Sequence, residues 1–361
     1  MSSPAPPALV VGTGFGCRTQ VPALRAAGFE VVGLIGTDLG RTHGYADANG
    51  VPNAFTDLDQ AITQTGAVAV AVATPPHTHG ALTLTAISRG CHVICEKPFA
   101  KDLAEARAML EAAERAGVIH IIGHEFRWVP ERAMLARVIA DGTIGEPRLA
   151  TFTSLIPYLV NPGVNIPHWW FDVEAGGGWL GAAGSHLIDW IRTVLGDFAS
   201  LSGALLRLSR NDGADDGFVF RFRSLRGVEG VVQQSAADWG PPLDVVRVAG
   251  TKGTVWMEGS EIRLADRQGA RAVPMADDLR LPPLPPLGAD SRRETPQWRM
   301  LTQIELPSYI RLCESFRILI EGGTPPNCVP IPTFADGVAG MEVLDAIRAS
   351  AADGGATVKV S

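Results

Sequence analysis

The sequence predicts an α/β protein. Its first part forms a doubly wound parallel sheet, and its second part is an α+β domain built on a largely antiparallel open sheet. Three observations predict this class: the length, an alternation of strands and helices in the first third, and period-two patterns further along. At 361 residues the chain exceeds the size at which a single hydrophobic core usually stops growing. We therefore expect two domains, residues 1–123 and residues 124–361.

The first domain alternates short apolar strands with amphipathic helices. The expected strands cover residues 8–12, 29–35, 68–73, 92–95 and 118–122. The expected helices cover residues 21–27, 41–49, 80–89 and 103–116. Because these strands are apolar almost throughout, rather than on alternate residues, we expect a parallel sheet covered on both faces.

The second domain changes character. A helix at 130–141 precedes a strand at 147–155, and a glycine-rich loop opens a helix at 186–195. Between 200 and 264 the chain shows alternating stretches such as Phe218-Val-Phe-Arg-Phe-Arg, which predict an antiparallel meander. The proline-rich segment 274–297 is expected to be a surface loop or arm, since proline interrupts both helices and ladders. Two helices at 307–321 and 334–351 follow.

Composition narrows the class of protein. The chain is 46% hydrophobic and 19% charged, as expected of a soluble globular enzyme, and its net charge of −7 argues against nucleic-acid or membrane partners. The longest apolar run, 67–73, is too short to cross a bilayer, and the N-terminus lacks the features of a secretion signal. We therefore expect a cytoplasmic protein.

The cysteines support a reducing compartment. There are five, an odd number with scattered spacing, which indicates no disulfide framework. They are Cys17, Cys91, Cys95, Cys313 and Cys328. Cys91 and Cys95 fall on one side of a predicted strand, so we expect them to pack in the core rather than to bind metal.

A glycine-rich turn lies between the first strand and the first helix, in Val10-Val-Gly-Thr-Gly-Phe-Gly-Cys. Gly12 permits the tight turn of a Rossmann phosphate loop, and Gly14 lets the backbone approach a pyrophosphate. The third glycine of the fingerprint falls on the small residue Cys17. These residues, with Phe15 and Gly16, are the predicted phosphate-side contacts of a dinucleotide.

The end of the second strand bears on the choice between NAD and NADP. An acidic residue there would bind the ribose 2′-hydroxyl, whereas a neutral residue near an arginine accommodates a 2′-phosphate. Gly36 occupies the strand end, with Thr37 and Arg41 nearby, which favours NADP; Asp38 favours NAD. Arg41 is equally interpretable as a solvated helix residue, so both cofactors stay open.

Three further motifs identify a family. They are Ala73-Thr-Pro-Pro-His-Thr-His after the third strand, Cys95-Glu-Lys-Pro-Phe after the fourth, and the glycine-rich stretch 176–189 that opens a helix. Together they resemble the glucose–fructose oxidoreductase, inositol dehydrogenase and MocA (Gfo/Idh/MocA) family, over nearly the whole chain. The resemblance implies hydride transfer between NAD or NADP and a secondary hydroxyl or ketone of a sugar, glycoside, polyol or cyclic diol.

The resemblance also implies catalytic roles. Lys97 is expected beside the nicotinamide, where its ammonium stabilises a developing alkoxide, with Pro98 in an unusual turn or cis bond directing it. His186 is expected to exchange the hydroxyl proton, a task that suits an imidazole with a pKa of roughly 6.5. The remaining predicted cofactor contacts are Thr74, Pro75, His79 and Glu96.

The chain departs from the family pattern near the substrate. Ala182 stands where family members commonly carry aspartate, and Glu125 stands where they often carry asparagine. By the resemblance, Asp189 either contacts substrate or orients His186, and Asp172 could supply the carboxylate that Ala182 lacks. The predicted substrate contacts are Arg127, Tyr158, Trp170, Asp172 and Asp189. His168, Trp169 and Trp179 either line the same pocket or pack the glycine loop, and a tryptophan-rich pocket suggests a ring-bearing substrate.

Other interpretations remain at this point. No metal is expected, because His77 and His79 lack a cysteine or carboxylate partner at suitable spacing. Alternative functions are redox-neutral glycoside cleavage through transient oxidation with retained NAD, and a catalytically silent dinucleotide sensor. By family resemblance, the protein is expected to form a homodimer or homotetramer.

Overall fold

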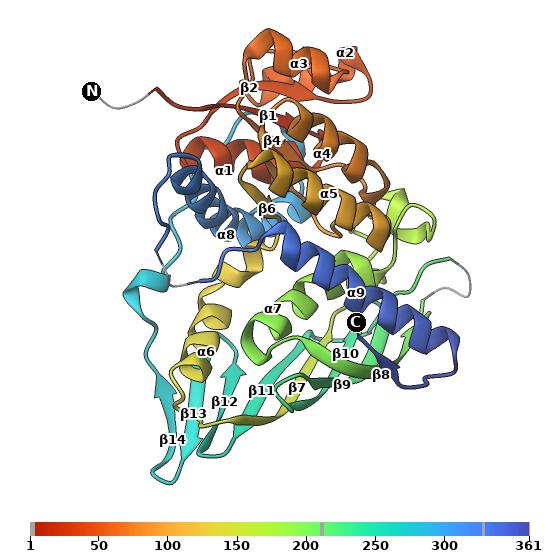
Figure 1. Ribbon diagram of the computed structural model, residues 1–361, viewed down its shortest axis with the longest axis vertical. Coiled ribbons are helices and arrows are strands. Elements are labelled where there is room, and N and C mark those ends of the chain that lie inside the picture. The colour runs from red at the N-terminus through yellow and green to blue at the C-terminus, as the bar shows by residue number, and fades with distance from the viewer. Residues whose placement is uncertain (1–3, 210–212, 327–328, 361) are drawn as a thin grey trace. The chain divides into compact units, whose positions relative to one another are not determined.

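The computed structural model describes residues 4–209, 213–326 and 329–360 (Figure 1). Cys328 lies outside these ranges. Contacts divide the chain into two compact units. The first unit contains residues 1–128 and 281–338, and the second contains residues 129–280 and 339–361. The chain thus returns to the first unit at residue 281 and enters the second unit again at residue 339.

The first unit is built on a six-stranded sheet with the order β3-β2-β1-β4-β5-β6. All its neighbouring strands are parallel. The strands are β1 (Pro7–Val11), β2 (Glu30–Ile35), β3 (Ala54–Phe55), β4 (Ala69–Val72), β5 (His92–Cys95) and β6 (His120–Ile122). The strand order reverses between β1 and β4, which makes the sheet doubly wound and places a ligand crevice at the carboxyl ends of these two strands. The predicted parallel sheet is confirmed.

Helices cover this sheet. They are α1 (Val21–Ala26), α2 (Leu39–Ala48), α3 (Leu58–Thr65), α4 (His79–Ser88) and α5 (Leu103–Ala116). Three of them begin at an aspartate whose side chain accepts a hydrogen bond from the backbone N–H three residues on: Asp38, Asp57 and Asp102. Neither β3 nor α3 was expected from the sequence. The strand β3 has only two residues, so it leaves no period to detect.

The first unit also includes α8 (Pro296–Ile320) and the first residues of α9 (Phe334–Ala352). The predicted start of α8 at residue 307 is wrong by three turns. Thr295 caps the helix, Pro296 occupies its first turn, and Pro307 lies inside it. Proline at the first turn is compatible with a helix, whereas Pro307 gave the misleading boundary.

The second unit is built on a nine-stranded sheet with the order β14-β13-β12-β11-β7-β10-β9-β8-β15. Only the pair of β7 and β10 is parallel among its described pairs. The strands are β7 (Pro147–Leu155), β8 (Phe198–Leu206), β9 (Gly217–Ser224), β10 (Glu229–Ser235), β11 (Leu243–Gly250), β12 (Gly253–Glu258), β13 (Glu261–Asp266), β14 (Gly269–Val273) and β15 (Val358–Lys359). The expected largely antiparallel open sheet is confirmed.

Buried and exposed side chains alternate along β9, which shows that one face of this sheet is covered. Phe218, Phe220 and Phe222 are buried, whereas the alternate residues Val219, Arg221 and Arg223 are exposed. The helices α6 (Pro130–Ala140) and α7 (Ser185–Leu195) lie along one face of the sheet (Figure 1). Period-two burial of this kind is the mark of a sheet with one covered face.

Candidate active site

The phosphate loop follows β1 and is shaped by its glycines. Gly12 has a φ of +114°, and a Cβ there would meet the Ala73 carbonyl oxygen at 2.3 Å. A Cβ on Gly14 would meet no atom within 4 Å, so the backbone at this position faces open space. Gly16 packs against Val10, and Phe15 packs edge-on against Tyr309 with 5.5 Å between ring centroids. An exposed backbone next to a strained glycine fits a dinucleotide pyrophosphate.

The helix that follows this loop has an irregular first turn. Residues Gly16–Gln20 form a π-helical turn before α1, which the sequence did not predict. Such turns occur mostly as single insertions and often at functional sites. Cys17 lies buried within it, and burial raises the pKa of its thiol to about 11. Cys17 therefore packs as a small apolar residue and has no reactive thiolate at neutral pH.

The end of β2 lies beside this loop. A Cβ on Gly36 would meet the Thr42 hydroxyl at 2.3 Å and the Thr13 methyl group at 3.1 Å, so no side chain fits at the strand end. Asp38 accepts a hydrogen bond from the Arg41 N–H, and the Arg41 Nε lies 3.6 Å from the same carboxylate oxygen. Thr37, Asp38 and Arg41 are exposed, so all three are accessible to the ribose of a cofactor.

The carboxyl ends of β1, β4 and β5 lie level with one another. Val11 is in register with Val72, and Val72 with Cys95. The next residues continue the ladder, since the Ala73 N–H donates to the Val11 carbonyl and the Glu96 N–H donates to the Val72 carbonyl. The phosphate loop, the Thr74 loop and the segment containing Lys97 therefore share one edge of the sheet.

Lys97 lies two residues beyond β5 and is half-buried. The Lys97–Pro98 peptide bond is cis. His79, at the start of α4, ties this segment to the Thr74–Pro75 loop. Its Nδ1 lies 3.0 Å from the Pro98 carbonyl oxygen and its Nε2 lies 2.7 Å from that of Thr74. Burial lowers the pKa of His79 to about 4, although these carbonyl oxygens act in the opposite direction. Through these two contacts the ring positions both loops.

A buried polar cluster lies behind Lys97. The Glu96 carboxylate accepts hydrogen bonds from the Tyr309 hydroxyl at 2.6 Å and from the Gln20 amide at 3.2 Å. Glu96 is 5% exposed and Glu125 is 1% exposed. The Gly123 N–H donates to the Cys95 carbonyl, which brings the Glu125 turn alongside Glu96. The two carboxyl groups therefore lie close together in the interior, near the half-buried ammonium group of Lys97.

Burial governs the charge of this cluster. It raises the pKa of Glu96 to about 7, although Lys97 and the hydrogen bonds from Tyr309 and Gln20 oppose it. The pKa of Glu125 is raised well above its ordinary value, first by burial and then by the neighbouring charge of Glu96. Two carboxyl groups that share a site without water do not both ionise readily, because the two negative charges would repel each other. The pair of Glu96 and Glu125 therefore retains a proton near neutral pH.

We expect this pair to make stability fall as pH rises. The folded protein keeps protons that the unfolded chain releases near pH 4.5, so this contribution is full below that pH and is lost as pH rises through about 7. Glu125→Gln keeps the shape and cannot ionise. Between pH 5 and pH 8 the free energy of unfolding should therefore fall less for this variant than for the wild type, by roughly 1–3 kcal/mol.

Urea denaturation at several pH values measures this difference. Glu111→Gln, on the exposed face of α5, is the matched control and should follow the wild type. Identical pH dependence of the wild type and Glu125→Gln would show that the pair holds no such proton.

Arg127 lies in the short 3₁₀ turn Glu125–Trp128 and is 4% exposed. Its guanidinium donates to the Pro330 carbonyl at 3.1 Å and pairs with Asp336 at 3.2 Å. These contacts join the turn to the start of α9 within the first unit. Arg127 was predicted to contact substrate, and the described contacts give it a structural task as well.

The second unit carries the other predicted catalytic residue. His186 lies in the first turn of α7, is 7% exposed, and is followed one turn later by Asp189, which is 1% exposed. A second π-helical turn, Leu180–Gly184, precedes this helix and contains Ala182. Ala182 is buried, and as an alanine it cannot provide the carboxylate that the family resemblance implies at this position.

An aromatic cluster adjoins the glycine-rich loop of the same unit. The ring centroids of Trp170 lie 6.0 Å from Tyr158, 5.8 Å from Trp169 and 5.7 Å from Trp179. Trp179 is 8% exposed, whereas the other three rings are half-buried. A Cβ on Gly177 would meet the Trp169 carbonyl oxygen at 2.2 Å, so the glycine loop packs tightly on these tryptophans. The structure is compatible with both interpretations of these aromatic residues. They pack against the glycine loop, and the rings that are partly exposed could also line a substrate pocket.

Two aspartates organise this loop. The Asp172 carboxylate accepts hydrogen bonds from the Glu174 and Ala175 N–H groups, which form a local turn. Asp215, which the sequence did not single out, accepts a hydrogen bond from the Leu180 N–H at 2.7 Å. Burial raises the pKa of Asp215. Asp215 carried no signal in the sequence, because it lies in an irregular segment before β9.

Comparison with known proteins identifies the chain. A family model described as the oxidoreductase family with an NAD-binding Rossmann fold matches residues 8–124, and the GFO/IDH/MocA C-terminal domain matches residues 133–256. A D-apiose dehydrogenase from Paraburkholderia graminis is 30% identical over 275 residues, which cover 74% of this chain and 72% of the relative. The chain belongs to the Gfo/Idh/MocA oxidoreductase family.

Other members of the family are similar over greater lengths. A levoglucosan dehydrogenase from Pseudarthrobacter phenanthrenivorans is 27% identical, covering 84% of this chain and 83% of the relative. A solved structure of levoglucosan dehydrogenase in complex with NADH and levoglucosan matches with a TM-score of 0.81 at 24% identity, covering 99% of each chain. This structural match shows that the two proteins share the fold.

Two further observations describe this family member. Among the described residues, no helix combines the length and apolar character needed to span a bilayer. The described residues also contain no group of three or more histidine, cysteine or acidic side chains placed to hold a metal ion. Cys17, Cys91, Cys95 and Cys313 are buried free thiols.

Proposed function

We propose that the protein is an NAD(P)-dependent dehydrogenase or reductase that acts on a secondary hydroxyl or ketone of a cyclic sugar or related polyol. One observation carries the proposal: Lys97 and the open backbone at Gly14 lie on the same carboxyl edge of one parallel sheet. Ligands of doubly wound sheets bind at this edge, next to the point where the strand order reverses.

The chain offers a place for the dinucleotide. Gly12 and Gly14 would hold the pyrophosphate, Thr37 and Arg41 the adenosine ribose, and the Thr74–Pro75 loop the middle of the molecule. The bound nicotinamide supplies hydride exchange at its ring. Protein side chains carry out all other steps of the proposed mechanism.

Lys97 would stabilise the reacting oxygen. Its ammonium can donate a hydrogen bond to a hydroxyl that is losing its proton, and its charge stabilises the alkoxide that develops. The proton-holding pair of Glu96 and Glu125 lies behind it and keeps the local negative charge low. A fully ionised pair would draw Lys97 away from substrate, so we assign the buried proton a positioning role.

His186 would exchange the substrate hydroxyl proton. The imidazole lies in the first turn of α7, and Asp189 lies one turn further along the same helix. We propose that Asp189 supplies the carboxylate that Ala182 lacks, either at His186 or at the substrate. Arg127, Tyr158, Trp170 and Asp172 are the remaining proposed substrate contacts.

The aromatic cluster supports a ring-bearing substrate. The apolar faces of sugar rings stack on tryptophan and tyrosine side chains, and Tyr158 and Trp170 present partly exposed rings. The levoglucosan complex of a relative of the same fold agrees with a compact cyclic sugar. We therefore propose anhydro sugars, cyclic pentoses and glycosides as the substrate class.

A substrate survey tests this proposal. The purified protein is incubated with NAD⁺ or NADP⁺ and with levoglucosan, D-apiose or a cyclic polyol, and the absorbance of reduced nicotinamide is followed. We expect reduced cofactor to accumulate with at least one cyclic sugar. Sugar cleavage without net reduced cofactor would instead indicate redox-neutral glycoside cleavage, and no reaction with bound cofactor would indicate a sensor.

The choice of cofactor has its own test. Arg41→Ala should weaken NADPH binding about tenfold and NADH binding much less, because only NADPH has a 2′-phosphate to lose a charged partner. Fluorescence titration with each reduced cofactor measures both dissociation constants. Equal effects on the two cofactors would remove Arg41 from the 2′-phosphate site.

The exposed sheet face suggests how subunits assemble. Leu149, Val219, Val231 and Leu243 point to the uncovered face of the nine-stranded sheet and are 38–56% exposed. We propose that this face forms a homodimer or homotetramer in the cytoplasm. In this scheme residues 1–123 bind the dinucleotide, and residues 124–361 provide substrate binding and subunit contacts.

A further inference from the structure

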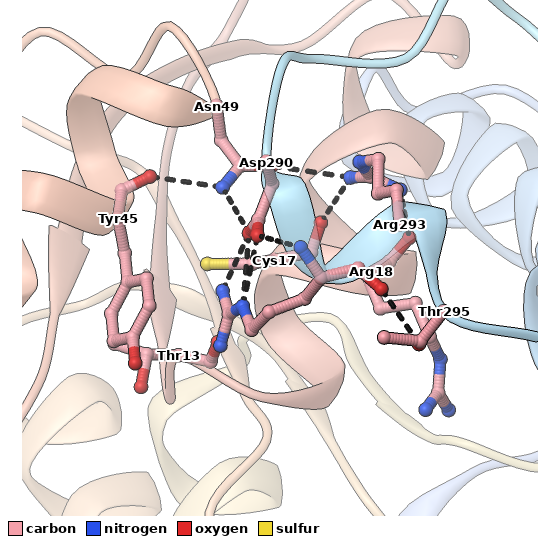
Figure 2. A network of polar contacts seen from close by, with 9 residues as sticks. Thr13, Cys17, Arg18, Tyr45, Asn49, Asp290, Arg293 and Thr295 are labelled. Atoms are coloured by element: carbon pink, nitrogen blue, oxygen red, sulfur yellow. Dashed lines mark hydrogen bonds and ion pairs between the residues drawn. The ribbon is translucent and has the colours of Figure 1, made fainter. Parts of the chain in front are cut away.

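From residue 281 onward, the proline-rich segment before α8 belongs to the first unit and ends against the phosphate loop. It finishes in a short 3₁₀ turn, Ser291–Glu294, and the side chain of Asp290 accepts a hydrogen bond from the Arg292 N–H of this turn. Figure 2 shows this turn beside the glycine loop and the end of α2. The sequence predicted a surface loop or arm here and assigned it no partner.

Arg292 connects the turn to the centre of the phosphate loop. Its Nη1 donates to the Thr13 carbonyl at 2.9 Å, and Thr13 lies between Gly12 and Gly14. Its Nε and Nη2 donate to the Asp290 carboxylate at 2.9 and 2.6 Å. The guanidinium also lies over the Tyr45 ring at 3.9 Å and over the Trp298 ring at 4.5 Å. Only the planar fork of arginine makes all these contacts at once.

Arg293 connects the turn to the π-helical start of α1. Its Nη2 donates to the Cys17 carbonyl at 2.6 Å, and its Nη1 donates to the Arg18 carbonyl at 3.3 Å. In a π-helical turn the Cys17 carbonyl would pair with the N–H five residues on, but that residue is Pro22, which has no N–H. Arg293 supplies the hydrogen-bond donor that Pro22 lacks.

Asp290 bonds Arg292 directly and is linked to Arg293 through Asn49. It is 4% exposed and also accepts a hydrogen bond from the Asn49 amide at 3.0 Å. Burial would raise the pKa of this carboxyl, yet the hydrogen bonds from Arg292 and Asn49 hold it at about 2. The carboxylate is therefore ionised at working pH. Asn49 also bonds Arg293, so the network reaches the end of α2 (Figure 2).

We propose that Asp290, Arg292 and Arg293 form a brace that holds the phosphate loop in the conformation that binds the dinucleotide. The inference rests on dinucleotide binding by the first unit and adds a positioning role for a segment outside the Rossmann sequence. The carbonyls of Thr13, Cys17 and Arg18 accept hydrogen bonds from Arg292 and Arg293, which fixes the backbone of the loop around the open space at Gly14. A loop ordered in advance binds more tightly because less conformational freedom is lost on binding.

The brace predicts a loss of affinity shared by both cofactors. In Arg292→Ala the dissociation constants of NADH and NADPH should each rise about tenfold, because both contain the pyrophosphate. At saturating cofactor kcat should stay within about twofold of the wild type, since no brace residue reaches the reacting atoms. Arg292→Lys should recover only part of the affinity, because lysine keeps the charge but not the fork.

The control is Arg89→Ala, which removes another arginine–carboxylate pair of the same unit. Arg89 pairs with Asp59 and precedes β5, at the amino edge of the sheet, so both dissociation constants should stay unchanged. Arg293→Met gives a second brace variant if Arg292→Ala does not fold, and it should show the same shared loss. Circular dichroism verifies folding of each variant.

Three results would overturn the brace. Wild-type affinity in folded Arg292→Ala or Arg293→Met would show that the loop needs no support. A loss confined to NADPH would make Arg292 a 2′-phosphate ligand. Absence of dinucleotide binding in the wild type and in Arg89→Ala would reject the cofactor assignment itself, and the brace with it.

Discussion

Lys97→Ala should lower kcat by roughly 10²- to 10⁴-fold while leaving the dissociation constant of the dinucleotide within about threefold of the wild type. The ammonium is proposed to act on the reacting oxygen, and the glycine loop is proposed to hold the cofactor phosphates. Removing the charge therefore raises the barrier of the chemical step and leaves most cofactor contacts in place. Steady-state kinetics and fluorescence titration measure the two quantities separately.

Matched variants distinguish this result from a general disturbance. Lys101→Ala removes an exposed lysine four residues further along and should keep wild-type kinetics. His186→Ala should show a loss of kcat similar to that of Lys97→Ala, because the proton and the alkoxide belong to the same step. Wild-type turnover in both Lys97→Ala and His186→Ala would reject the proposed catalytic roles.

Gly14→Val should weaken dinucleotide binding tenfold or more, about 1.4 kcal/mol or above. Its Cβ would meet no protein atom within 4 Å, so the variant should fold and its side chain should occupy the space proposed for phosphate. Isothermal calorimetry with NADH and NADPH measures the effect.

Gly340→Val is the matched control for this substitution. Gly340 lies on α9, where a Cβ would likewise meet nothing within 4 Å, and the variant should bind both cofactors normally. Unchanged affinity in folded Gly14→Val would place the pyrophosphate elsewhere.

Local patterns were enough to predict most of the fold. Apolar strands alternating with helices predicted the parallel sheet, and the alternating phenylalanines of β9 predicted an antiparallel meander. Elements without a period were missed, as with β3, which has two residues. The start of α8 was misplaced because Pro307 lies inside the helix, where proline is unfavourable and tertiary packing outweighs its effect.

The candidate site was predictable only where short motifs mark it. The glycine loop and the Glu-Lys-Pro motif are each a continuous stretch of sequence, and they indicated Gly12, Gly14 and Lys97 as candidate site residues. The partners of these residues come from distant parts of the chain. Tyr309 bonds Glu96 across 213 residues, and Arg292 bonds Thr13 across 279 residues. Such pairs leave no trace in local periodicity, so only the structure reveals the buried cluster and the brace.

The most direct test of the account is isotope transfer. A cyclic sugar that is a substrate, such as levoglucosan, is prepared with deuterium on every carbon and incubated with the protein and its oxidised cofactor. Mass spectrometry then determines whether the reduced nicotinamide carries deuterium. Direct hydride transfer predicts one deuterium in each reduced cofactor molecule formed by the wild type, and far slower formation by Lys97→Ala. Reduced cofactor without deuterium, or sugar turnover that leaves the cofactor oxidised and unlabelled throughout, would contradict the account.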